Sequence, residues 1–73
     1  MEDTQIKETL ARNGFKTLEL DDKCIIVTID LCTDGWFERM EWFDRFIGRE
    51  GFLRDFAQKV ADDRACIAYR RVI

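Results

Sequence analysis

One stretch, Trp36–Ile47, constrains the fold of this 73-residue chain more than any other. It holds both tryptophans and three of the six phenylalanines. On a helix, at about 100° per residue, its apolar residues form one narrow stripe: Trp36, Met40, Phe43 and Ile47. Trp42 and Phe46 lie on a neighbouring flank, one turn apart. A helix that packs on a small core needs an apolar arc of only roughly 100°. The stretch therefore predicts a core helix with surplus aromatic surface.

The first half of the chain reads as a helix followed by a β-hairpin. Residues 3–13 form the helix, which is capped by Asp3 or Thr4 and ends at Gly14. Residues 15–20 alternate as a strand, and a polar turn separates them from 24–31. The second strand is dense in β-branched residues and has one wholly apolar face. Together they predict an antiparallel hairpin.

The second half begins with the aromatic helix, for which Thr33 or Asp34 is the expected N-cap and Gly48 the expected end. Residues 52–62 are modestly amphipathic at helical spacing, which predicts a third helix. Residues 65–72 alternate as a final strand.

The predicted order is α-β-β-α-α-β, in a single domain spanning residues 1–73. A three-stranded, mainly antiparallel sheet with the helices on one face is the simplest way to bury the strand aliphatics and the helix aromatics together. The predicted class is α+β.

Composition argues against catalysis and against bound cofactors or metals. The chain has no histidine and no serine, so the usual acid–base and nucleophilic groups are missing. None of the three cysteines stands in a C-x-x-C pair, and no phosphate-binding or calcium-loop motif occurs. Cys32, beside a helix N-terminus, is a weak candidate redox sensor. The missing acid–base and nucleophilic groups predict that the protein is not an enzyme. Unpaired cysteines and the lack of a signal peptide or membrane span predict that it is cytoplasmic.

A protein partner is the expected ligand. Trp, Phe and Arg are enriched at the centres of protein interfaces, and one flank of the aromatic helix combines them: Trp42, Phe46, Arg39, Arg45 and Arg49. The alternative is that both rings belong to the core.

Two forms of the interaction remain open. A self-complementary surface would make a homodimer and enlarge a marginal core. Alternatively, the chain is a small blocker of a larger partner, in which Asp21 and Asp22 could mimic phosphates. Acidic domains of this size that lack motifs recur among phage and mobile-element inhibitors, anti-CRISPR proteins included. An Arg- and aromatic-based, homodimeric nucleic-acid-binding protein is the alternative function, although the net charge of −3 disfavours it.

Overall fold

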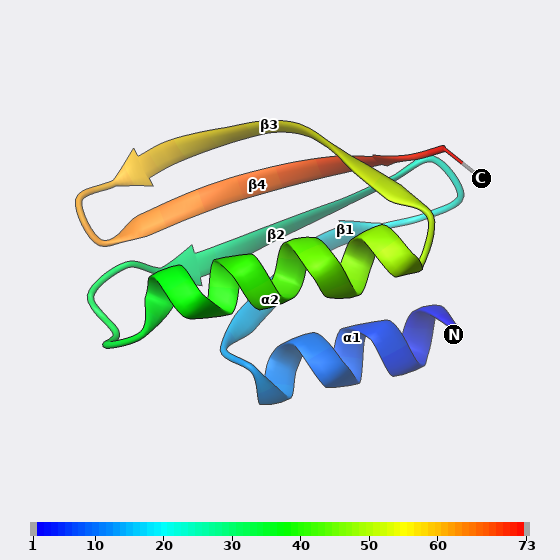
Figure 1. Cartoon of the computed structure of the whole chain (residues 1–73). Helices are drawn as coiled ribbons and strands as arrows, with labels where there is room; N and C mark the ends of the chain where they lie inside the picture. Colours follow the sequence, from blue (N-terminus) through cyan, green and yellow to red (C-terminus); the bar gives the residue numbers. More distant parts are fainter. Residues whose placement is uncertain (1, 73) are drawn as a thin grey trace.

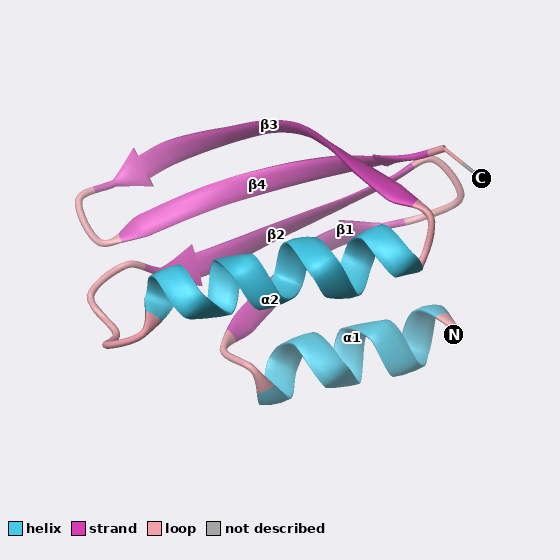
Figure 2. Cartoon of the chain, viewed as in Figure 1, coloured by secondary structure: helices cyan, strands magenta, loops and turns pink. Residues whose placement is uncertain are grey.

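The computed structural model describes residues 2–72, which form two helices and four strands (Figure 2). In chain order the elements are α1 (Asp3–Arg12), β1 (Phe15–Leu20), β2 (Cys24–Asp30), α2 (Trp36–Arg49), β3 (Phe52–Ala61) and β4 (Arg64–Arg71). No helix within residues 2–72 has the length and apolar character needed to cross a membrane.

The four strands form one antiparallel sheet in the order β1-β2-β4-β3. Both helices lie against the same face of this sheet (Figure 1). The α+β class, the β1–β2 hairpin and the helices on one face are as predicted. The predicted three strands and the order α-β-β-α-α-β are wrong, because the chain has a fourth strand where a third helix was expected.

That fourth strand is β3, and its side-chain spacing explains the error. Leu53 and Phe56 are three residues apart, a spacing typical of one helix face. In the sheet, Asp55 is an extra residue at an irregularity in the pairing with β4. A β-bulge of this kind places residues three apart on the same face of a strand. The bulged strand therefore has the three-residue apolar spacing that is also typical of a helix.

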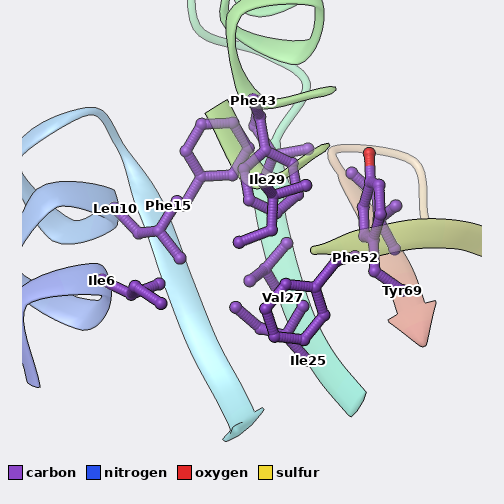
Figure 3. Close-up of a cluster of buried hydrophobic side chains, with 11 residues drawn as sticks. Ile6, Leu10, Phe15, Ile25, Val27, Ile29, Phe43, Phe52 and Tyr69 are labelled. Atoms are coloured by element: carbon purple, nitrogen blue, oxygen red, sulfur yellow. The ribbon is translucent and has the colours of Figure 1, made fainter. Parts of the chain in front are cut away.

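The core lies between the helices and the sheet (Figure 3). Ile6 and Leu10 enter from α1 and Phe43 and Ile47 from α2, each at most 1% exposed. Their main counterpart is the apolar face of β2: Ile25, Val27 and Ile29. Phe15, Phe52, Ile67 and Tyr69 complete the cluster. In the stripe predicted for the aromatic helix, Phe43 and Ile47 are buried in the core, whereas Trp36 at its start remains 39% exposed.

The first helix ends as predicted, with Asn13 as the C-cap and Gly14 left-handed (φ 86°). The other helix ends differ from the predicted caps. At α1, Glu2 rather than Asp3 or Thr4 occupies the cap position. Its backbone N–H donates a hydrogen bond to the side-chain oxygen of Gln5 (3.1 Å). At α2 the cap residue is Gly35, whose φ of 82° is left-handed. The helix continues through Gly48, and the turn falls instead at Gly51, whose φ is 93°.

Candidate protein-binding surface

Trp42 and Phe46 form a stacked pair on α2. Their ring centroids are 5.0 Å apart with 8° between the planes. Trp42 also approaches Phe15 at 6.1 Å, and Phe15 in turn packs on Phe43 at 4.7 Å. Both Trp42 and Phe46 are half-buried against the core cluster. The pair therefore closes one side of the core while its outer side faces solvent, so its rings are neither fully buried nor fully exposed.

The three arginines predicted for this flank lie beside the stacked pair along α2. Arg39 is half-buried, and its guanidinium lies 3.5 Å from the position that a Cβ on Gly14 would occupy. Arg39 thus covers the α1–β1 junction. Arg45 and Arg49 are exposed. They are one turn apart and border Trp42 and Phe46 on the solvent side.

Asp21 and Asp22 lie in the β1–β2 turn, on a different element from the arginines. The Asp21 carboxylate accepts hydrogen bonds from the backbone N–H groups of Lys23 (2.8 Å) and Cys24 (3.0 Å). These two bonds are the main reason that the pKa of Asp21 is lowered from its ordinary value of 3.8. Asp21 therefore stabilises the turn, and its carboxylate is engaged by the protein's own backbone. Asp22 is exposed.

The basic doublet near the C-terminus is divided between the two faces of the sheet. Arg71 is half-buried on the helix side, where its guanidinium lies over the Phe52 ring at 4.5 Å and pairs with Asp3 at 3.6 Å. It also donates to the backbone carbonyl of Asp21 (3.1 Å). Arg70 points to the opposite face and is exposed. The doublet does not form a joint basic site.

The surface that sequence reasoning missed is the face of the sheet opposite the helices, here called the outer face. Ile26, Ala68 and Phe56 lie directly opposite one another on three neighbouring strands. Leu53 lies in the adjoining row, opposite Arg70. Leu53 and Phe56 are each 51% exposed. We call these four residues (Ile26, Leu53, Phe56, Ala68) the outer strip.

The outer strip is unusual because an antiparallel sheet with one covered face normally alternates apolar residues inward and polar residues outward. Here the outward residues at the centre of the sheet are apolar. Two of the four residues of the outer strip come from β3, so the strip can be found from the sequence only if β3 is predicted as a strand. The signal available in the sequence was the apolar character of Ile26, Cys66 and Ala68 on predicted strands.

A second constellation ties α2 to the two last strands. The Tyr69 hydroxyl donates a hydrogen bond to the Asp44 carboxylate, and Arg54 on β3 lies 3.8 Å from the same carboxylate. Burial, and then the bond to Asp44, raise the pKa of the Tyr69 phenol well above its ordinary value. The group is held neutral and acts as a structural link.

Within residues 2–72 the remaining polar clusters offer little chemistry. Glu19, Asp21 and Cys24 bring one ligand atom each within 4.8 Å of one another. Burial and the two neighbouring carboxylates raise the pKa of the Cys24 thiol, so the free thiol is held protonated. Two surface hollows have volumes of about 190 and 240 Å³. Both are smaller than the roughly 300–1,000 Å³ of typical small-molecule sites.

Comparison with known proteins found no matching family model, no matching curated protein and no matching solved structure.

Proposed function

We propose that this chain is a non-enzymatic protein-binding module that docks another protein on its outer strip. The observation that carries the proposal is the apolar row Ile26–Ala68–Phe56 on a sheet face that neither helix covers (Figure 1). In this row Phe56 is 51% exposed and Ile26 is half-buried, whereas the small Ala68 between them is buried. Exposed, contiguous apolar surface with a polar rim is characteristic of interaction sites.

The rim has the composition that such a site requires. Arg70 borders the strip beside Leu53, and Gln58 lies in the next row beyond Phe56. Lys16 and Glu19 extend the outer face on β1. Aromatic and aliphatic residues in the middle with mixed charges around them resemble the centre and rim of a protein interface. The partner is thus a protein with an apolar patch of its own, and the proposed role is that of a small inhibitor that masks this patch.

The α2 flank with Trp42, Phe46 and Arg45 is the second candidate surface for the same function. Its stacked rings and exposed arginines have hot-spot composition. The two rings also pack on the core, whereas Leu53 and Phe56 of the outer strip are each 51% exposed and lie outside the core cluster.

Photo-crosslinking in the organism that encodes the chain tests the proposal. A photoreactive phenylalanine analogue replaces Phe56 in one variant, Phe46 in a second and Lys7 in a third, which serves as the control on the exposed face of α1. We expect position 56 to yield a discrete adduct with a protein other than a second copy of the chain, and we expect the control to lack this adduct. Added wild-type chain should compete the adduct away, whereas a Phe56→Lys chain should not.

The outcomes separate the candidates. An adduct from position 46 alone would move the binding site to α2. Adducts with nucleic acid, together with binding that falls steeply as salt is raised, would favour the nucleic-acid alternative. No specific adduct from either position above the Lys7 control would refute a protein-binding role for both surfaces.

A further inference from the structure

The far edge of β3 is a separate feature from the outer strip. β3 ends the sheet, and no strand within residues 2–72 pairs with its far side. It is 10 residues long and exposed from Leu53 to Ala61. Only Phe52 contributes to the core. A long edge strand is a template for pairing with another chain, and proteins commonly protect such edges with proline, short length, charged side chains or bulges. β3 is long and has no proline, but it carries Arg54, Asp55 and Lys59 and has an extra residue at Asp55.

The backbone groups on this edge can be assigned from the pairing with β4. The N–H of Val72 donates to the carbonyl of Gly51 (2.8 Å), which makes Phe52 and Arg71 a non-hydrogen-bonded pair. Successive residues of a strand direct their backbone groups to opposite edges, so Phe52 and Arg54 direct theirs away from β4. The extra residue Asp55 shifts this alternation, and beyond it Ala57 and Lys59 direct theirs away.

Between Phe52 and Lys59 the free edge consequently has a symmetric spacing, and a second irregularity in the pairing with β4 lies beyond this part, at Val60. The outward residues of the edge are separated by two positions (52 to 54), then three (54 to 57), then two (57 to 59). This sequence of intervals is the same when it is read in either direction. The midpoint lies between Asp55 and Phe56.

We propose that this edge pairs antiparallel with β3 of a second copy of the chain, about a two-fold axis through that midpoint. In this register Arg54 of each copy lies opposite Ala57 of the other, and Phe52 lies opposite Lys59. Each outward backbone group meets an outward backbone group of the second copy. The result is a continuous sheet of eight strands, four from each copy, with all helices on one side.

The bulge is the reason that the edge suits its own copy better than a regular strand. A regular strand advances two residues between successive outward groups, so it would fall out of register at the three-residue interval. A second β3 carries the same extra residue at the same distance from the axis. No two like charges lie directly opposite in this register, and the two exposed Phe56 side chains approach each other beside the axis on the outer face.

The size of the contact sets the expected strength. In this register residues 52–59 of each copy face each other, and at about 3.3 Å per residue they give an edge of about 26 Å. With a sheet roughly 10 Å thick, each copy contributes on the order of 300 Å². The total is well below a standard interface of about 1,200–2,000 Å², so we expect a weak, reversible dimer.

Opposite charges placed at Ala57 test both the dimer and its register. Ala57 is exposed, so neither Ala57→Glu nor Ala57→Lys disturbs the core. In the proposed register residue 57 faces Arg54 of the other copy. The Glu variant should dimerise roughly fivefold more tightly and the Lys variant roughly fivefold more weakly, from two cross-strand charge pairs per dimer. Ala57→Pro, which removes an outward N–H, should abolish dimerisation.

The measurement is sedimentation velocity over a micromolar to submillimolar concentration series, with circular dichroism to show that each variant is folded. A wild-type chain that stays at 8.7 kDa throughout overturns the pairing and leaves the outer-strip proposal to its own crosslinking test. A dimer that all three variants leave unchanged uses another surface and also overturns it. A dimer weakened equally by Glu and Lys rejects the register, since like charges would then face each other at the axis. Should the Pro variant fail to fold, the Glu and Lys pair still decides.

Discussion

Replacement of Trp42 by Ala should lower the free energy of unfolding by about 2 kcal/mol. Truncation of a fully buried large aromatic costs about 3–5 kcal/mol. Trp42 is only half-buried, so about half of that cost applies, and it includes the stacking on Phe46 at 5.0 Å, which contributes about 0.5–1.5 kcal/mol. For a domain of this size, about 2 kcal/mol corresponds to a decrease in Tm of roughly 8–16 °C.

The assay is urea unfolding followed by far-ultraviolet circular dichroism, which does not depend on the tryptophan that is removed. Trp36→Ala is the matched control, because it makes the same chemical change at a residue that is 39% exposed and whose ring contact is Phe37 at 5.8 Å. We expect the control to lose less stability than Trp42→Ala, because Trp42 packs against the core cluster and stacks on Phe46, whereas Trp36 lies outside that cluster. A Trp42 variant that is as stable as the control would refute the assignment of this ring to the edge of the core, and would point to a surface role instead.

Two further predictions concern ionisable groups. The folded chain lowers the pKa of Asp21, so the stability that the Asp21 carboxylate contributes is present above the ordinary value of 3.8 and is lost as the pH falls through the lower folded value. Asp21→Asn should therefore make the free energy of unfolding depend less on pH in acid. An unchanged pH dependence in acid would contradict this. Because burial and Asp44 raise the pKa of Tyr69, the phenol should stay neutral above its ordinary value of 10 until the chain unfolds, and phenolate absorbance of this single tyrosine should appear together with the loss of circular dichroism. Tyr69→Phe should cost about 1–2 kcal/mol of stability, because it leaves Asp44 without its hydroxyl partner; a loss below about 0.3 kcal/mol would show that this bond is not a structural link.

Most of the helices and strands could be predicted because their patterns are local. The β-branched run of β2 has one wholly apolar face, and that face is buried as the pattern indicates. The turn between β1 and β2 follows from Asp21, whose side chain bonds to backbone two and three residues later. The central stripe of α2 follows from helical periodicity. In each case the residues that determine the structure are neighbours in the sequence.

The candidate site was less predictable. Sequence reasoning grouped the α2 residues on one flank, and the structure shows them together there, but it could not tell how far Trp42 and Phe46 would be buried. That depends on Phe15, which is distant in the chain and approaches Trp42 only once β1 is in place. Likewise, Arg70 and Arg71 are neighbours in the sequence, but the strand alternation directs them to opposite faces of the sheet, where Arg71 contacts Phe52 and Asp3.

The sequence by itself determined the α+β class, the first hairpin and the position of the aromatic helix, since apolar periodicity and turn residues act over a few positions. Only the tertiary structure decided that 52–61 is a strand. Its exposed residues have no core to impose a two-residue period, so pairing with β4 and the bulge at Asp55 determine its conformation. The outer strip and the free edge both result from that pairing, because a hydrogen-bonded neighbour is a non-local partner that no local pattern specifies.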